Sequence, residues 1–316
     1  MNNILDIVTV IANPIRWDSR LRLARDAIAD WLKEPNVRIT LVETAYGARD
    51  HDLVDISSDP RVNHVAVRST SLVWNKESLL NIGISRLPPD ARYVATLDAD
   101  IHFRKAGWAT ETVHALQLHP VVQVWGAAYD LGPNDEHIQT HVSFARLFHE
   151  GQPIIPQGDK FWKFNGGPYD YAHPGFGWAW TRSILNKIGG LFDVGGTGSG
   201  DHHMALAMVG AAEKSVPGTA HPNYIAALKT WEARALTHIN KNIGFVHGTI
   251  EHRFHGSKAA RGYLSRWDLF TKHAFDPYSD LKRNSFGVVE WSGAKPELER
   301  EWALYLKSRA EDGNQI

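Results

Sequence analysis

The chain has 316 residues, of which 43% are hydrophobic and 22% charged, and its formal net charge is -1. This composition is typical of a globular protein, and the near-neutral charge argues against non-specific binding to nucleic acid or anionic lipid. The absence of cysteine excludes disulfides and thiolate metal sites. The first residues, MNNILDIVTVIANP, predict a strand rather than a signal peptide, and no apolar run approaches the length of a membrane span. We therefore expect a cytoplasmic protein that binds no membrane.

The first half of the sequence alternates between strand-like and helix-like segments. Apolar runs predict strands at residues 5–11, 37–42, 62–67, 93–97 and 121–128. Helical periodicity predicts helices at residues 18–32, 75–86 and 106–118, with Asp18 and Asn75 as caps of the first two. This alternation predicts an α/β fold with a mostly parallel central sheet flanked by helices, and functional groups of such sheets gather at the carboxyl ends of the strands.

The second half begins with a break in this pattern. Residues 129–174 are rich in Gly, Pro, His and aromatic side chains, which indicates a lid, an insertion or a small antiparallel ribbon. Further strands are expected at 177–181 and 243–246, and further helices at 182–188, from about 201, at 224–238, at 257–273 and in the tail. We predict a main domain over residues 1–256 and a C-terminal helical extension over residues 257–316, packed on it as one structural unit.

The segment Asp98-Ala99-Asp100 directly follows a predicted strand. In an extended chain, residues i and i+2 project to the same side, so both carboxylates can face one ion. Carboxylate oxygens suit Mg²⁺ or Mn²⁺, and such a metal can hold a diphosphate. Asp-X-Asp also occurs by chance in solvated turns, but the position after a strand favours the metal site.

His252 and His255 are three residues apart, so their side chains can meet on one side of a helical turn or tight bend. Because imidazole is the commonest protein metal ligand, we expect this pair to share a metal with Asp100. Two alternatives are an accidental spacing in a chain with 17 histidines and a zinc site that includes His247.

Asp201 and His202 follow the glycine-rich stretch 189–200, where a helix is expected to begin. Asp201 is a plausible N-cap. In the functional interpretation, Asp201 or His202 is a general base that removes a proton from an acceptor hydroxyl. Both roles can hold together.

Three further candidates follow the first two strands. Arg16, after Pro14, can pair with phosphate through its planar guanidinium or be simply exposed to solvent. Glu43 can accept hydrogen bonds from a nucleoside base or ribose. No G-x-G-x-x-G follows the first strand and no G-x-x-x-x-G-K-[ST] occurs, which argues against dinucleotide and P-loop sites.

Five motifs in this order resemble the GT-A glycosyltransferases, in particular the β-1,4-galactosyltransferase and polypeptide N-acetylgalactosaminyltransferase group. Pro14-Ile15-Arg16 matches the Pro-Phe-Arg motif on the donor nucleotide, and WNKESLLNIG, residues 74–83, is similar to Phe-Asn-Arg-Ala-x-Leu-Leu-Asn-x-Gly. Asp98-Ala99-Asp100 corresponds to the Asp-Val-Asp metal motif. GGLFDVGGTGSGDHH is similar to the loop with the acidic catalytic pair, and His252-Arg253-Phe254-His255 resembles the Met-x-x-His metal motif.

The resemblance spans roughly residues 8–257 and implies a GT-A fold with transfer of a sugar from a nucleotide-sugar, expected to be UDP-linked, to a hydroxyl. It implies a donor-site role for Trp74 and Lys76, with Asp98 beside them, and it makes Asp100 the direct ligand of Mn²⁺ or Mg²⁺. Asp201 as base in a single displacement would invert the anomeric centre. His202 stands where an aspartate is expected, which leaves the identity of the base open.

Two other functions use the same residues. A metal-dependent phosphohydrolase or nucleotidyltransferase would act on a phosphate ester, and a non-catalytic carbohydrate- or nucleic-acid-binding protein would keep the fold without turnover. The acceptor of a transferase would be a saccharide, a protein or a hydroxylated base in phage-type DNA. Lys258, Arg261 and Arg266 can hold a phosphate or an anionic acceptor.

Overall fold

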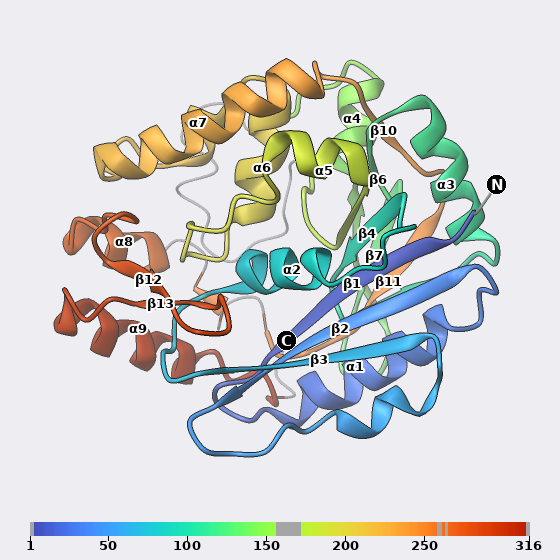
Figure 1. The fold of residues 1–316 in the computed structure, drawn as a ribbon. Helices are drawn as coiled ribbons and strands as arrows, with labels where there is room; N and C mark the ends of the chain where they lie inside the picture. The colour runs from blue at the N-terminus through green and yellow to red at the C-terminus, as the bar shows by residue number, and fades with distance from the viewer. Residues whose placement is uncertain (1–2, 156–171, 258–260, 263–264, 314–316) are drawn as a thin grey trace.

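The computed structural model describes residues 3–155, 172–257, 261–262 and 265–313, and a seven-stranded sheet forms its centre (Figure 1). The strand order is β10-β6-β9-β4-β1-β2-β3. The strands are β1 (Leu5–Ala12), β2 (Val37–Tyr46), β3 (Val62–Ser69), β4 (Tyr93–Leu97), β6 (Val121–Gln123), β9 (Gly177–Thr181) and β10 (Ile243–Phe245). Only β9 runs antiparallel to its neighbours, which are β4 and β6. The predicted α/β fold with a mostly parallel sheet is confirmed.

Helices cover both faces of this sheet. On one face, α1 (Asp18–Trp31) and α3 (Trp108–Leu118) share an apolar core with β1 and β2. The other face carries α2 (Lys76–Ser85), α5 (Arg182–Ile188), α6 (Gly200–Met208) and α7 (Pro222–His238). In Figure 1, α1 lies below the sheet and α2, α6 and α7 lie above it. Because both faces are covered, β1 is an almost continuous apolar run, as is typical of parallel strands.

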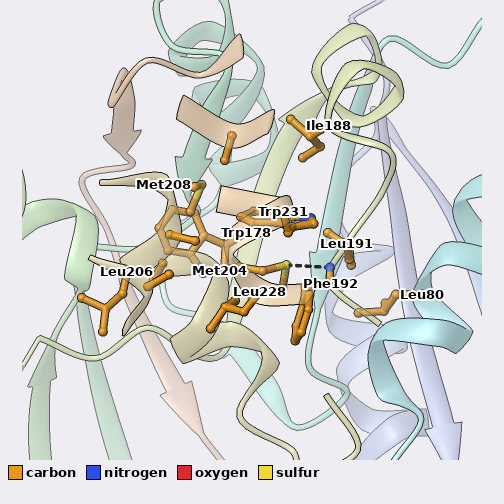
Figure 2. Packing of buried hydrophobic residues seen from close by; sticks show 14 of the residues in the cluster. Leu80, Trp178, Ile188, Leu191, Phe192, Met204, Leu206, Met208, Leu228 and Trp231 are labelled. Carbon is orange, nitrogen blue, oxygen red and sulfur yellow. Dashed lines mark hydrogen bonds between the residues drawn. The ribbon is translucent and has the colours of Figure 1, made fainter. Parts of the chain in front are cut away.

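The core above the sheet is built around tryptophan and methionine side chains. Met204 and Met208 of α6 pack with Trp178 of β9 and Trp231 of α7 (Figure 2). The Trp231 indole donates a hydrogen bond to the carbonyl of Gly190 at 3.0 Å, so its polar atom is satisfied while its ring is buried. This packing fixes α6, and with it the segment that carries Asp201.

A second sheet, in the order β5-β11-β7-β8, lies at the carboxyl end of β4. Its strands are β5 (Ile101–Phe103), β11 (Thr249–His252), β7 (Ala127–Leu131) and β8 (His137–Val142). The register of β11 pairs His252 with Ile101 on one side and with Asp130 on the other. This sheet therefore places His252 beside the segment that follows β4.

Two predicted elements were wrong in extent. The strand expected at 121–128 is two strands, because the chain leaves the first sheet after Gln123 and enters the second at Ala127. The helix expected at 257–273 is α8 (Ser265–Lys272), so the chain after His255 is a loop rather than a helix where it is described.

The cap of α1 is Trp17, and Asp18 is already helical. The predicted ribbon within 129–174 is partly present as the antiparallel pair β7 and β8, while residues 156–171 lie outside the described chain.

The remaining elements are short or belong to the C-terminal extension. They are η1 (Val54–Ser58), α4 (Phe144–His149), η3 (Ala212–Ser215), the hairpin β12 (Leu281–Arg283) and β13 (Val289–Trp291), and α9 (Pro296–Ser308). Trp291 and Trp302 of this extension belong to the same core as α6 and α7. In the part of the chain that is described, every helix is too short or too polar to traverse a lipid bilayer.

Candidate metal and donor site

Asp100, His252 and His255 come together at the carboxyl end of β4. The Asp100 Oδ2 atom lies 3.1 Å from His255 Nε2 and 3.7 Å from His252 Nε2. One ligand atom from each side chain lies within 4.8 Å of the other two. His252 ends β11 and His255 lies in the loop beyond it, so the two rings, three residues apart, meet across a bend in the chain. Two remote segments of the sequence thus meet at one point.

The donor set of this cluster fits a divalent cation. The second carboxylate oxygen of Asp100, Oδ1, is buried and has no hydrogen-bond partner within the described residues. A buried carboxylate oxygen without a partner is costly, and a bound cation would satisfy it. Two imidazole nitrogens with one carboxylate favour Mn²⁺ over Mg²⁺, because Mg²⁺ prefers oxygen ligands.

Asp130, which no sequence pattern singled out, holds His252 in place from behind. Its Oδ1 lies 2.7 Å from His252 Nδ1, and its Oδ2 lies 2.6 Å from Nε2 of the buried His141. Burial opposes ionisation, but hydrogen bonds from His141 and His252 keep the pKa of Asp130 well below its usual range. Carboxylates behind metal-binding histidines fix the ring orientation. This contact leaves His252 Nε2 directed at Asp100.

Lys76 and Asp98 form an ion pair beside the metal cluster. Burial would lower the pKa of Lys76, but the carboxylates of Asp98, Asp201 and Glu77 outweigh this effect and raise it. Lys76 is therefore a half-buried cation among three acidic side chains. Asp98 does not join the cluster of Asp100 and the two histidines, and its role beside a donor stays a prediction.

Trp74 lies against the glycine-rich loop that precedes α6. A Cβ atom on Gly198 would be 2.8 Å from the Trp74 ring, and Gly198 has a φ of +76°, so a larger residue would be both crowded and strained. The Trp74 indole nitrogen is buried and has no hydrogen-bond partner in the described chain. The loop thus brings Trp74 next to the segment that carries Asp201.

Asp201 and His202 occupy the first turn of α6. The cap of this helix is Ser199, so the predicted capping role of Asp201 is wrong. Asp201 Oδ1 accepts a hydrogen bond from the backbone nitrogen of His202 at 2.8 Å, and its Oδ2 faces Gly175. Burial lowers the pKa of His202 to about 4, with Asp201 opposing the shift and Arg266 adding to it. His202 is therefore a neutral imidazole and a weak base near neutral pH.

The three candidates after β1 and β2 are not members of the metal cluster. Pro14 is in the turn after β1, and the exposed Arg16 lies 3.6 Å from Asp52. The buried Glu43 accepts hydrogen bonds from the backbone nitrogens of Asp52 at 2.5 Å and Leu53 at 3.1 Å. Glu43 thus anchors the loop after β2, and its role toward a nucleoside stays a prediction. Lys258 lies outside the described residues.

Glu77 is a second residue that the sequence did not single out. It lies buried in the first turn of α2, and its carboxylate packs against Gly200 at the start of α6. Burial raises its pKa from the usual 4.5 to about 7, although Lys76 opposes the shift, and Asp201 and Asp98 add to it.

We expect the free energy of unfolding of Glu77→Gln to exceed that of the wild type by up to about 3 kcal/mol more at pH 8 than at pH 4. The raised pKa of the folded state contributes stability that is complete below 4.5 and is lost as the pH rises through 7. A neutral glutamine does not undergo this loss. The measurement is urea unfolding of both proteins from pH 4 to 8, with the exposed Glu297→Gln as control. If the free energy of unfolding changes with pH in the same way in the wild type and in Glu77→Gln, the raised pKa of Glu77 is contradicted.

Comparisons with known proteins give only a remote likeness. No protein-family model and no curated protein matches the sequence. Among solved structures, a mannosyltransferase from Pyrobaculum calidifontis in complex with GDP-Man and Mn²⁺ matches at 17% identity and a TM-score of 0.38, over 75% of this chain and 62% of that one. GalNAc-T7 with UDP, GalNAc and Mn²⁺ matches at 12% and 0.41, over 96% and 54%. The chain thus spans less than two thirds of the length of either.

Another matching structure belongs to a different class of enzyme. It is 4-diphosphocytidyl-2C-methyl-D-erythritol synthase from Anaerococcus prevotii, at 13% identity and a TM-score of 0.36, over 78% of this chain and 89% of that one. Sugar transferases and this synthase therefore match at similar scores. At such scores the likeness does not decide the reaction, which has to be argued from the side chains of the site.

Proposed function

We propose that the protein is a metal-dependent glycosyltransferase of the GT-A type, which moves a sugar from a nucleotide-sugar to a hydroxyl. The observation that carries the proposal is the convergence of Asp100, His252 and His255 beside the Lys76–Asp98 pair. A cation site next to a half-buried lysine suits a diphosphate, which carries concentrated negative charge. The order of the five sequence motifs supports the same function.

Asp100, His252 and His255 would hold Mn²⁺, and Lys76 would face the diphosphate beside it. When bound, the cation neutralises negative charge that develops on the departing nucleoside diphosphate. Trp74, against the glycine-rich loop, would line the donor pocket. Lys76 stays protonated during the reaction because the surrounding carboxylates raise its pKa.

We assign the general base to Asp201 rather than His202. His202 is buried with a pKa of about 4, whereas Asp201 is half-buried and reaches the surface beside Gly175. Asp201 would take the proton of the acceptor hydroxyl as its oxygen bonds to the anomeric carbon. The bond from that carbon to the diphosphate breaks in the same step, so the configuration would invert.

We expect Mn²⁺ to raise the melting temperature more than Mg²⁺ at equal concentration. The physical reason is that two of the three ligands are imidazoles, which Mg²⁺ binds poorly. The measurement is a thermal-shift titration with each metal, alone and with UDP- or GDP-sugars, followed by excess EDTA. A response to Zn²⁺ alone would favour the zinc alternative.

Analysis of the reaction products, with and without EDTA, separates the rival functions. A glycosyltransferase releases nucleoside diphosphate and forms a glycosylated product in equal amounts. Release of phosphate or pyrophosphate without sugar transfer would identify a phosphohydrolase or nucleotidyltransferase. Binding that is insensitive to EDTA and produces no turnover would identify a binding protein. Saccharides and DNA with hydroxylated bases are the acceptors to test first.

A further inference from the structure

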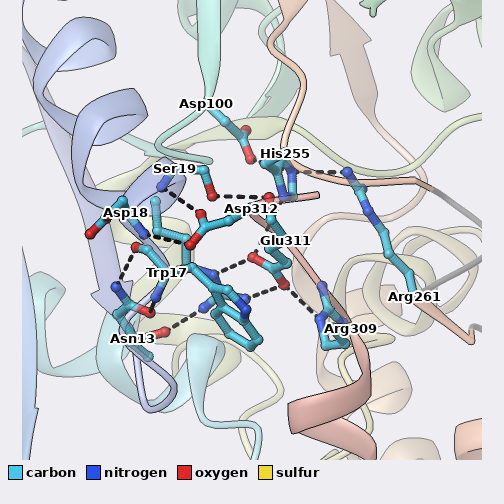
Figure 3. A network of polar contacts seen from close by, with 12 residues as sticks. Asn13, Trp17, Asp18, Ser19, Asp100, His255, Arg261, Arg309, Glu311 and Asp312 are labelled. Carbon is cyan, nitrogen blue, oxygen red and sulfur yellow. Dashed lines mark hydrogen bonds and ion pairs between the residues drawn. The ribbon is translucent and has the colours of Figure 1, made fainter. Parts of the chain in front are cut away.

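The segment Arg309–Asp312, which we call the C-terminal strap, follows α9 and runs behind the loop of His255 to the start of α1. Figure 3 shows Glu311 between the His255 ring and the residues at the beginning of α1. The strap passes close behind the loop of His255, because a Cβ on Gly256 would lie 2.8 Å from the carbonyl oxygen of Ala310. A glycine is thus needed where the loop and the strap cross.

Glu311 is the buried centre of the strap. Its side chain is fully buried and lies 2.5 and 2.7 Å from the Arg20 guanidinium and 2.6 Å from Arg309. Glu311 is therefore a fixed anion.

This anion faces the far side of a candidate metal ligand. Glu311 Oε2 lies 3.6 Å from His255 Nδ1, while His255 Nε2 lies 3.1 Å from Asp100. Nδ1 is buried and has no hydrogen bond in the described chain, and a movement of roughly 0.5 Å would bring it within bonding range of Glu311. A neutral imidazole that binds a metal through Nε2 carries its proton on Nδ1.

Two contacts at His255 Nε2 make opposite demands on the tautomer. The guanidinium of Arg261, 3.0 Å away, can only donate, so it favours an Nε2 that accepts. The carboxylate of Asp100, 3.1 Å away, can only accept, so it favours an Nε2 that donates. Glu311, behind the ring, favours the proton on Nδ1. The arrangement repeats that of His252, whose Nδ1 lies 2.7 Å from Asp130.

The strap has its own anchor at α1. The Asp312 carboxylate accepts hydrogen bonds from the backbone nitrogens of Asp18 at 3.0 Å and Ser19 at 2.8 Å. The α1 helix lacks a side-chain cap from its own capping residue, Trp17, so Asp312 supplies one. This contact holds the strap without facing the metal cluster.

We infer that Glu311 is a positioning residue for the metal ligand His255, so that the C-terminal strap is a part of the metal site. Glu311 orients the ring and keeps its proton on Nδ1, which leaves Nε2 free for the cation. The inference rests on the proposed metal site but not on sugar transfer. A protein that binds Mn²⁺ and transfers no sugar would leave it intact.

The test compares two substitutions in the strap. We expect Glu311→Gln to weaken Mn²⁺ binding about 10- to 100-fold, measured by electron paramagnetic resonance without nucleotide. Asp312→Asn replaces one of the two oxygens that accept hydrogen bonds from the start of α1 with an amide nitrogen that cannot accept, so it should lower the melting temperature but change the Mn²⁺ affinity less than about threefold. Wild-type affinity in Glu311→Gln, or an equal loss in both variants, would overturn the inference.

A second measurement does not depend on the Glu311→Gln protein, whose fold is at risk because Arg20 and Arg309 lose the charge of their buried partner. The ¹⁵N spectrum of histidine rings in the metal-free wild-type protein at pH 8 reports the tautomer of His255, assigned with His255→Gln. We expect the Nδ1-protonated form. An Nε2-protonated ring would exclude the proposed role of Glu311, even if the variant does not fold.

Discussion

Replacing Asp100 with alanine is expected to abolish the Mn²⁺-dependent rise in melting temperature and to reduce nucleotide-sugar turnover roughly a thousandfold. Asp100 is the only carboxylate in the three-residue cluster, and its Oδ2 faces both histidines. A metal that stabilises a departing diphosphate contributes several kcal/mol, and each 1.36 kcal/mol corresponds to a factor of about ten in rate.

The matched control for Asp100→Ala is Asp55→Ala. Asp55 is an exposed carboxylate paired with Arg25, away from the cluster. It should leave the metal response and the turnover unchanged. Because His252 keeps its contact with Asp130 in the Asp100→Ala protein, the fold should persist without metal. An unchanged Mn²⁺ response in Asp100→Ala would refute the metal site.

Replacing Asp201 with asparagine is expected to lower kcat by about 10²- to 10⁴-fold while the affinity for the donor stays the same. Asparagine is nearly isosteric with aspartate and can keep the contact with the His202 backbone, but it cannot take a proton. The measurement is the release of nucleoside diphosphate at saturating donor, together with a donor titration by thermal shift. A full rate in Asp201→Asn would assign the base elsewhere.

Two further variants test whether the loss of kcat is specific to Asp201. His202→Gln removes the other candidate base, and we expect it to keep kcat within about tenfold per folded molecule, because His202 is already neutral and buried. Glu213→Gln removes an exposed carboxylate in η3, just after α6, and should have no effect. A larger loss of kcat in His202→Gln than in Asp201→Asn would reverse the assignment.

Much of the fold can be predicted from the sequence because long apolar runs end abruptly at polar residues. The bounds of β4, β9 and α5 agree with the prediction. The second sheet could not be predicted beyond the ribbon of β7 and β8, because strands of three or four residues, such as β5 and β11, are too short to show a period. Their pairing depends on contacts remote in sequence.

The residues of the candidate site, too, could be predicted from the sequence only in part. Asp100, His252 and His255 could be identified because carboxylate and imidazole side chains in short, regular spacings indicate metal chemistry. Asp130 and Glu311 carry no such signal, since one lies within a strand and the other in a polar tail. Their roles arise only where the folded chain brings them behind the two histidines.

The pairing of Arg20 with Glu311 has a consequence for the order of folding. The two residues are 291 positions apart, so their contact closes nearly the whole chain into a loop. Such long-range contacts form after local ones, because the entropy of closing the loop has to be overcome first. The central sheet can therefore assemble before Glu311 reaches its place, and the proposed metal site would be completed only at the last stage of folding.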